Sequence, residues 1–312
     1  MNNLIILSRN FEIYRSLLAN HRFHEMNLIL ATDQPDDIHM GIACNILLGD
    51  APSVRKVLDV LPDLQWAQTT WAGVEPLVDP KLRHDYKLTN ARDVFGPLMS
   101  EYVFGYILQH HRRIIQRFLA QQEGVWDGSI SDSLQGKKVG LLGVGSIGSY
   151  LASTAKHFGM IVKGFTLSSQ GCRDVDEYFH EGQLRDFSKD LDYLVCSLPN
   201  TDATYHLIDA DLLKQLPKEC VLINVGRGRT LDEEALIKAL GSGGLAGAVL
   251  DVFEKEPLPS DHPFWKMPNV LITSHTAAHS FPGDLVGLFI ENYDRFTKNK
   301  PLIGLINFDT GY

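Results

Sequence analysis

The stretch VGLLGVGSIG, residues 139–148, decides the fold. It opens with an apolar run that predicts a buried strand, and the helical spacing of apolar residues over 147–158 predicts a helix directly after it. Between them, the first glycine allows a tight turn and the third lets the helix pack closely on the strand. A strand, a glycine turn and a helix in this order indicate a parallel sheet covered by helices.

The same turn is a candidate phosphate-binding site. Its second glycine leaves room for a pyrophosphate against the backbone, and the amide groups at the start of the helix carry a partial positive charge that holds phosphates. A glycine-rich turn that binds no ligand is the alternative. We predict a dinucleotide site, and its residues are Gly143, Gly145, Ser146, Ile147 and Gly148.

The residues after the turn bear on the choice of cofactor. NAD-binding turns of this kind carry an Asp or Glu about 20 residues further on, which accepts a hydrogen bond from the ribose 2′-hydroxyl. No acidic residue occurs between Gly148 and Asp174, and Thr166 stands where the acid is expected. Because a carboxylate would repel a 2′-phosphate and hydroxyls would not, we predict NADP(H) in preference to NAD(H), whose use stays open. The residues expected near the 2′ group are Thr166, Ser168 and Ser169, with Arg173 as a further phosphate partner.

Strand–helix alternation runs through the whole chain, and its 312 residues fit two domains at about 100–200 residues each. In the first third we predict strands at 4–7, 28–31, 46–48, 65–69 and 87–88, and helices at 11–19 and 52–61. Later strands are predicted at 139–142, 161–165, 193–196, 221–225, 246–250 and 270–273, with helices at 147–158, 174–181 and 232–240. One or two helices over 97–122 and a polar loop over 123–136 join the two series. An amphipathic stretch at 285–296 is expected to pack back on the first domain.

The amino-acid composition limits which classes of binding partner and which cellular compartment we expect for this protein. Acidic residues outnumber basic ones by 38 to 29, and the formal charge of −9 disfavours a nucleic-acid or anionic-membrane partner. The first nine residues hold an apolar run of only four, too short for a secretory or membrane segment. Four scattered cysteines are typical of reduced, buried thiols, so we expect a cytoplasmic protein. They are Cys44, Cys172, Cys196 and Cys220.

Three later segments each follow a predicted strand and carry candidate catalytic residues. They are INVGRGR at 223–229, LDVFEKEP at 250–257 and ITSHTAAH at 272–279. In open α/β sheets, ligands bind outside the carboxyl ends of the strands, so an Arg, a Glu and a His are expected to meet there. Surface arginines, solvated glutamates and a structural histidine are the open alternatives. The HxxxH spacing of the third segment lacks a glutamate and a third ligand, so we predict no metal site.

Five motifs in this order and spacing resemble the D-isomer-specific 2-hydroxyacid dehydrogenase family: GVGSIG, SLPNTDAT, INVGRGRTLDEEAL, GAVLDVFEKEPLP and TSHTAA. WAGVEPL and LTNARDVFGPLMSEYVFG extend the likeness more loosely to the first domain. The closing NFDTGY and the length are most similar to the glyoxylate/hydroxypyruvate reductase A branch. Ser274 replaces the usual Pro, Glu75 the usual Asp and Gly226 the usual Ala.

The resemblance implies an α/β fold of two Rossmann-like domains with parallel sheets and an active-site cleft between them. Residues 1–98, completed by 282–312, would form a flavodoxin-like substrate domain, and 99–281 the dinucleotide-binding domain. The implied catalytic residues are Arg227, Glu256 and His275. Further cofactor contacts are implied at Leu198, Pro199, Thr204, Val225, Gly226, Asp251, His275 and Ala277. Substrate contacts are expected at Trp71, Ala72, Gly73, Val74, Arg92 and Arg227.

These residues predict an NADPH-preferring reductase of small 2-keto acids such as glyoxylate or hydroxypyruvate. Arg227 would bind the substrate carboxylate, His275 would donate a proton to the carbonyl oxygen, and Glu256 would orient the imidazole. The resemblance also implies a homodimer. A dehydrogenase of a larger acid, such as D-3-phosphoglycerate or D-lactate, and a nucleotide-sensing scaffold similar to the corepressor branch stay open.

Overall fold

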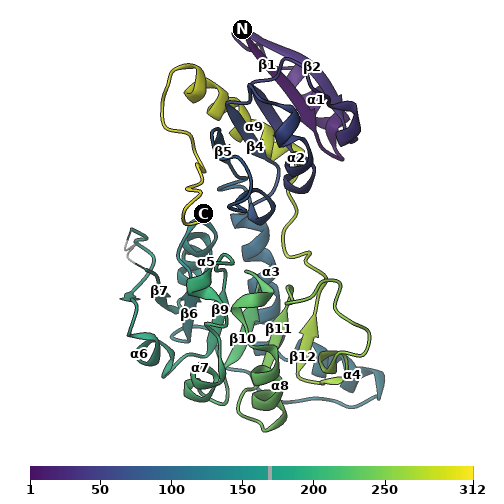
Figure 1. The fold of residues 1–312 in the computed structure, drawn as a ribbon. Coiled ribbons are helices and arrows are strands. Elements are labelled where there is room, and N and C mark those ends of the chain that lie inside the picture. Colours follow the sequence, from purple (N-terminus) through teal and green to yellow (C-terminus); the bar gives the residue numbers. More distant parts are fainter. Residues whose placement is uncertain (168–170, 312) are drawn as a thin grey trace. The chain divides into compact units, whose positions relative to one another are not determined.

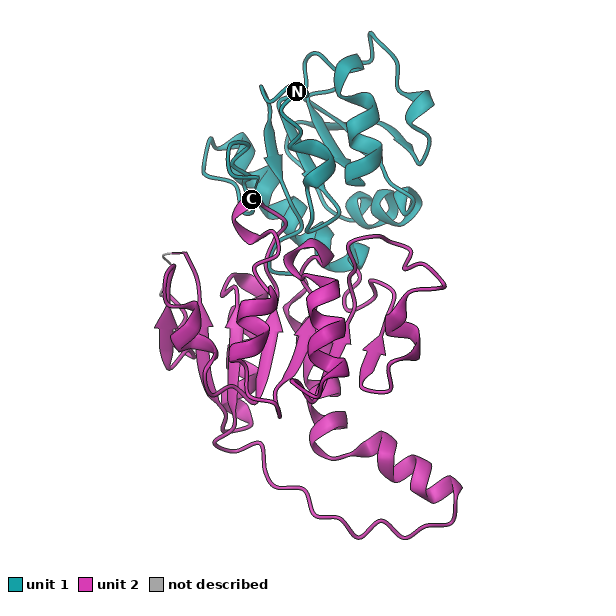
Figure 2. Ribbon diagram, turned by 60° about the horizontal axis from the view of Figure 1, so that its bottom comes forward, with its two compact units in different colours: residues 1–94, 280–312 teal, residues 95–279 magenta. Residues whose placement is uncertain are grey.

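The computed structural model describes residues 1–167 and 171–311. The chain forms two compact units, one of residues 1–94 and 280–312 and the other of residues 95–279 (Figures 1 and 2). We call them unit 1 and unit 2. Each is an α/β unit built on a parallel sheet, as the strand–helix alternation predicts.

Unit 1 contains a five-stranded parallel sheet in the order β2-β1-β3-β4-β5, which is the flavodoxin-like order. Its strands are β1 (Asn2–Leu7), β2 (Met26–Thr32), β3 (Ile46–Gly49), β4 (Trp66–Thr69) and β5 (Lys87–Thr89), and its helices are α1 (Phe11–Ala19), α2 (Ala51–Val57) and α9 (Pro282–Thr297). All five predicted strands and both predicted helices are confirmed, although α2 ends earlier than expected and a 3₁₀ turn, Leu58–Val60, continues it.

Helix α9 returns to unit 1, as the amphipathic stretch near the carboxyl end predicts. Leu285 and Phe289 are fully buried, and the Phe289 ring stacks on Trp66 of β4 with centroids 5.2 Å apart. Phe296 stacks on Trp66 as well, at 5.4 Å. Aromatic pairs of this kind dominate the burial of apolar surface in a core, so α9 is an integral part of unit 1.

Unit 2 contains a seven-stranded parallel sheet in the order β12-β11-β10-β9-β6-β7-β8, which is the Rossmann order with a seventh strand added. Its strands are β6 (Lys138–Leu142), β7 (Ile161–Phe165), β8 (Glu177–Phe179), β9 (Tyr193–Cys196), β10 (Val221–Asn224), β11 (Gly247–Leu250) and β12 (Val270–Ile272). Its helices are α3 (Gly96–His111), α4 (Ile114–Gln122), α5 (Ser146–His157), α6 (Leu184–Ser188), α7 (Ala210–Gln215) and α8 (Glu233–Gly241).

One predicted element of unit 2 is wrong. A helix was expected at 174–181, but Glu177–Phe179 forms the edge strand β8, which pairs in parallel with β7. With only three residues, whose burial rises from exposed Glu177 to buried Phe179, this segment shows no helical or strand period of its own. The unpaired edge of β7 selects a strand over a helix. The short helices α6 and α7 were not predicted, because five or six residues show too little periodicity.

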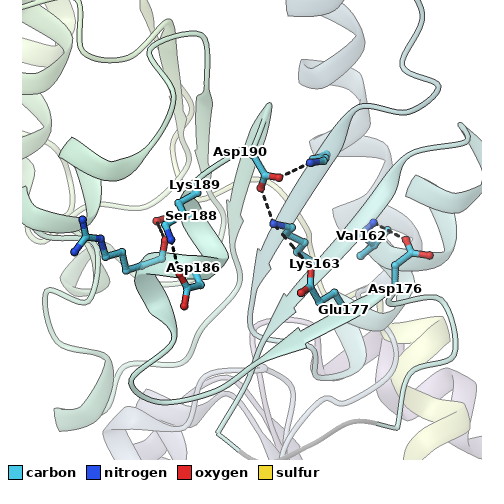
Figure 3. Close-up of polar contacts among 10 residues, drawn as sticks. Val162, Lys163, Asp176, Glu177, Asp186, Ser188, Lys189 and Asp190 are labelled. Carbon is cyan, nitrogen blue, oxygen red and sulfur yellow. Dashed lines mark hydrogen bonds and ion pairs between the residues drawn. The ribbon is translucent and has the colours of Figure 1, made fainter.

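A buried lysine lies at the amino end of the β6–β7–β9 region (Figure 3). Lys163 of β7 is 7% exposed, and its ammonium group donates to Asp190 at 2.5 Å. Asp190, which precedes β9, also accepts from Lys138 of β6. A buried charge is tolerated where a partner and hydrogen bonds accompany it. This cluster therefore links strands β6 and β7 to the segment that precedes β9.

Helix α4 and the loop after it stand out from the body of unit 2 (Figure 2). None of the α4 residues is buried. Several large apolar side chains of this segment are exposed: Ile114, Ile115, Phe118, Leu119, Val125, Trp126 and Ile130. Within residues 1–167 and 171–311, no helix combines the length and the hydropathy that a membrane span requires.

Candidate active site

Five turns lie side by side where strands β6, β9, β10, β11 and β12 end. The evidence is how closely they approach one another: a Cβ on Gly143 would lie 3.2 Å from Leu198, and one on Gly226 would lie 2.7 Å from the Leu198 carbonyl oxygen. A Cβ on Gly228 would meet the Phe253 backbone at 1.9 Å. Parallel strands bring their carboxyl ends to one edge of the sheet, and ligands of such sheets bind there. The candidate site of unit 2 is therefore this edge.

The glycine turn after β6 has the geometry that a dinucleotide pyrophosphate needs. Gly143 has a φ of +94°, and a Cβ on Gly148 would lie 2.1 Å from the Gly143 carbonyl oxygen, so both positions require glycine. A Cβ on Gly145 would meet no atom within 4 Å. Helix α5 begins at Ser146, directly after Gly145. No side chain caps the amides of its first turn, which includes Ile147, so these amides are available to a ligand. These residues fit a bound phosphate.

The neighbouring turns contain the remaining predicted cofactor contacts. Thr204 donates to the Pro199 carbonyl oxygen at 2.7 Å and forms a capping box with Thr201, so it holds the turn after β9. Val225 is buried, and its amide donates to Cys196. These residues shape the edge of the sheet, and their contact with a cofactor remains a prediction.

Thr166 lies at the end of β7 and is 8% exposed. Its amide donates to the Phe179 carbonyl oxygen of β8, and its own carbonyl oxygen contacts His180 Nδ1 at 3.0 Å. Ser168 and Ser169 lie outside the described residues. Arg173 is 94% exposed on its side chain and approaches Asp174 at 3.9 Å.

The two arginines of the turn after β10 have different surroundings. Arg227 is half-buried, and its Nη1 donates to the Gly226 carbonyl oxygen at 2.8 Å. Its carbonyl oxygen accepts from the Thr230 hydroxyl at 2.7 Å, which fixes the backbone at this position. Arg229 is exposed, and its guanidinium lies over the Tyr205 ring at 4.9 Å. The resemblance implies a catalytic role for Arg227 and none for Arg229, and that role remains a prediction.

The turn after β11 supplies two glutamates, and each pairs with a different histidine. Glu256 Oε2 lies 2.8 Å from His275 Nδ1, while its Oε1 accepts from the Phe253 amide at 3.0 Å. Glu254 Oε1 lies 2.8 Å from His206 Nε2. The structure therefore brings Glu256 and His275 together, as the resemblance implies, and places Glu254 in a separate pair that sequence reasoning did not find.

His275 is held by a buried carboxylate. Its φ is +56°, an uncommon value for a residue with a side chain, and its amide donates to the Asp251 carbonyl oxygen at 2.8 Å. The Asp251 carboxylate, 1% exposed, accepts from the Thr273 hydroxyl at 2.5 Å and from the amides of Thr276 and Ala277 at 2.8 and 3.0 Å. Asp251 thus clamps the chain on both sides of His275 although Ser274 stands where proline is usual.

Tyr102 of α3 completes this arrangement and was not predicted. Its hydroxyl lies 2.6 Å from Thr273 Oγ1, and because that oxygen donates its own hydrogen to Asp251, the tyrosine donates to Thr273. Burial raises the pKa of the Tyr102 phenol, so it keeps its hydrogen at neutral pH. Only the packing of α3 against the sheet could show this contact, since 171 residues separate the two side chains.

The predicted substrate residues of unit 1 lie at the carboxyl edge of its own sheet. Trp71, Ala72, Gly73 and Val74 follow β4, and Arg92 follows β5. Arg92 is exposed. Among residues 1–167 and 171–311, no group of three or more His, Cys, Asp or Glu side chains is arranged to hold a metal ion.

The sheet order, the glycine turn and the His–Glu pair define a dinucleotide-dependent oxidoreductase class of α/β protein. Residues 104–277 match the NAD binding domain of the D-isomer specific 2-hydroxyacid dehydrogenases. The chain belongs to this family of oxidoreductases.

Three relatives illustrate the likeness. Glyoxylate/hydroxypyruvate reductase A of Yersinia enterocolitica is 31% identical over 248 residues, which cover 77% of this chain and 79% of that protein. The crystal structure of a D-isomer specific 2-hydroxyacid dehydrogenase family protein from Aeromonas salmonicida is 39% identical with a TM-score of 0.90 over 99% of both chains. The NADPH-dependent glyoxylate/hydroxypyruvate reductase of Sinorhizobium meliloti, solved with NADP and sulfate, is 27% identical with a TM-score of 0.88 over 100% of both chains.

Proposed function

We propose that this protein reduces small 2-keto acids, glyoxylate or hydroxypyruvate, to 2-hydroxy acids of D configuration and prefers NADPH as the hydride source. The observation that carries the proposal is the His275–Glu256 pair at 2.8 Å, held by Asp251 beside the turns that carry Arg227 and the glycine motif. The names of the Yersinia and Sinorhizobium relatives support the choice of substrates.

In this proposal, His275 is the proton donor to the substrate carbonyl oxygen. A carboxylate only accepts hydrogen bonds, so the ring nitrogen that faces Glu256, Nδ1, carries a hydrogen, and Nε2 is left to hold the proton that is transferred. The His275 side chain is 51% exposed, so a substrate can reach it. The hydrogen bond to Glu256 orients the imidazole ring for this donation.

Arg227 binds the substrate carboxylate, because a guanidinium offers paired donors that match carboxylate geometry. When bound, the nicotinamide supplies the hydride chemistry. Residues 143–148 hold its pyrophosphate through backbone amides, so that no basic side chain is needed in the turn.

The cofactor preference rests on Thr166, which stands where NAD-binding relatives of this turn carry an acid. The complex of the Sinorhizobium relative with NADP agrees with it. Steady-state KM values for NADPH and NADH test the preference, and a clear preference for NADH would contradict it.

A panel of 2-keto acids with NADPH, followed by the loss of absorbance at the nicotinamide band, tests the reaction. We expect turnover with glyoxylate and hydroxypyruvate. Turnover only with pyruvate or with phosphohydroxypyruvate would transfer the assignment to a dehydrogenase of D-lactate or D-3-phosphoglycerate. No turnover with any keto acid would favour a nucleotide-sensing scaffold. The homodimer and the cytoplasmic location stay predictions, and sedimentation velocity measures the first.

A further inference from the structure

In the loop that follows β4 in unit 1, two carbonyl oxygens accept hydrogen bonds from the protein, whereas two amides find no acceptor among the described residues. The Trp71 carbonyl oxygen accepts from the Thr69 hydroxyl at 2.8 Å and from the Ala91 amide at 2.9 Å. The Ala72 carbonyl oxygen accepts from Asn90 Nδ2 at 2.9 Å. Among the residues that the structure describes, the amides of Ala72 and Gly73 donate to no acceptor.

Together with peptide geometry, these contacts fix the direction in which the two amide hydrogens point. In a trans peptide the carbonyl and the amide hydrogen of the same unit point in opposite directions. With the Ala72 carbonyl directed at Asn90, the Gly73 amide hydrogen points away from β5. The Trp71 carbonyl oxygen accepts from Thr69 and Ala91, so the Ala72 amide hydrogen of the same peptide unit points away from these residues. Two neighbouring donors of the loop are therefore aimed away from the sheet and suit an anion.

Asn90 is itself held firmly. Its backbone amide donates to the Gly304 carbonyl oxygen at 3.1 Å, and its carbonyl oxygen accepts from Gln68 Nε2 at 2.9 Å. Gly304 has a φ of +70°, and a Cβ there would lie 2.8 Å from Asn90 Oδ1, so only glycine fits at this position.

A buried polar network extends from this point to α9. Gln68 Oε1 accepts from the Thr89 hydroxyl at 2.8 Å and from Asn292 Nδ2 at 3.1 Å, and all three side chains are fully buried. Asn292 also exchanges two hydrogen bonds with the Ile303 backbone. Networks of this kind specify one arrangement of the groups they join, so the segment after α9 fixes the residue that orients the loop.

We propose that Asn90 is a positioning residue for the substrate: through the Ala72 carbonyl it aims the amides of the 71–74 loop at the carboxylate of the 2-keto acid. The inference rests on the proposed function, and it adds a residue that does not touch the substrate. Arg92, exposed two residues further on, places a positive charge at the same edge of the unit 1 sheet and favours an anionic ligand.

The test compares Asn90→Ala and Asn90→Asp with a matched control, Asn45→Ala. Asn45 is a half-buried asparagine of the same unit at the amino end of β3, where its Oδ1 accepts from the Asn3 amide at 2.7 Å. Asn90→Asp keeps the size of the side chain but sets an acceptor against the Ala72 carbonyl. KM and kcat with glyoxylate, the Kd for NADPH from nucleotide fluorescence, and Tm are measured for each protein.

We expect both Asn90 variants to raise KM for glyoxylate by roughly 10-fold to 100-fold, as the loss of hydrogen bonds to a charged group does. The Kd for NADPH should stay unchanged, and Asn45→Ala should change neither constant. A normal KM in folded Asn90 variants, with an active parent protein, would overturn the inference alone. A parent protein that turns over neither glyoxylate nor hydroxypyruvate would overturn the proposed function and the inference with it.

Discussion

His275 Nδ1 and Glu256 Oε2 lie 2.8 Å apart, although 19 residues separate them in the chain. The contact joins the turn after β11 to the turn after β12, two neighbouring strands of the sheet. Glu256 is further fixed by the Phe253 amide, and His275 by the Asp251 backbone. Contacts within the protein therefore set the orientation of the imidazole, which is what the proposed general acid catalysis requires.

Replacing His275, the proposed proton donor, should abolish most of the activity. We expect His275→Gln to lower kcat by about 10²–10⁴, the contribution of a positioned acid, because glutamine cannot supply a proton. The Kd for NADPH should stay the same. Stopped-flow reduction of glyoxylate and nucleotide fluorescence measure the two quantities, and a near-normal kcat would remove His275 from this role.

The two arginines after β10 should behave differently. Arg227→Ala is expected to raise KM for glyoxylate by roughly 10-fold to 100-fold, because the carboxylate loses a charge-assisted hydrogen-bond partner. Arg229→Ala is the matched control: it removes a cation that lies over the Tyr205 ring on the exposed surface, so KM should not change. Equal effects of the two substitutions on KM would contradict the assignment.

A methyl group in the glycine turn should block the cofactor without unfolding the protein. A Cβ on Gly145 meets no atom within 4 Å, and its φ of −80° is accessible to alanine. We expect Gly145→Ala to keep Tm and to raise the Kd for NADPH at least about tenfold, since one lost hydrogen bond to a charged phosphate is worth about 1.5–3 kcal/mol.

Gly287→Ala in α9 is the control for this turn, because a Cβ there is equally unobstructed. It should leave the Kd unchanged and raise Tm slightly, because alanine is favoured over glycine inside a helix. An unaltered Kd in Gly145→Ala would show that no phosphate approaches this backbone.

The cluster at Lys163 should contribute measurable stability (Figure 3). Asp190→Asn weakens the partner of a lysine whose side chain is only 9% exposed, and we expect the free energy of unfolding to fall by about 1–2 kcal/mol. Asp186→Asn is the control, because its pair with Lys189 is exposed on both sides and should matter little. Urea titration measures both, and equal midpoints for the two variants would contradict the role of burial.

The pH dependence of that difference has a definite sign. Partial burial works to raise the pKa of Asp190, but hydrogen bonds from Lys138 and Lys163 outweigh it and hold the pKa below its ordinary value of 3.8. A carboxylate with a lowered pKa in the folded state stabilises the fold above its unfolded pKa and loses that effect as pH falls through the folded pKa. The difference between the parent protein and Asp190→Asn should thus be constant at neutral pH and shrink in acid below about pH 4.

Local sequence was sufficient for elements with a strong period and clear ends. The strand and helix around Gly143 have both, and the structure confirms them. The segment at 174–181 has neither, and it becomes strand β8 only because β7 offers a free edge. Local pattern cannot report whether such a partner exists.

The residues of the candidate site also fall into those that the sequence could predict and those that it could not. The motifs around Arg227, Glu256 and His275 could be found in the sequence because each follows a strand in a fixed spacing. Which glutamate faces His275 could not be found from the residues alone, because Glu254 and Glu256 stand in the same charged turn; only the family resemblance implied Glu256. The only local feature that marks Asp251 in the sequence is its place directly after strand β11. The groups that donate hydrogen bonds to its carboxylate lie 22 to 26 residues further along the chain.

The sequence by itself determined the parallel α/β architecture and the family, because hydrophobic period, glycine spacing and ordered motifs are properties of the chain read in order. The tertiary structure brought Glu256 and His275 together, as the resemblance implied. It alone decided that Asp251 and Tyr102 hold the histidine loop and that Asn90 directs the carbonyl of Ala72. These contacts join segments that are distant in the chain, and they form only once the order of strands in each sheet has brought the segments together.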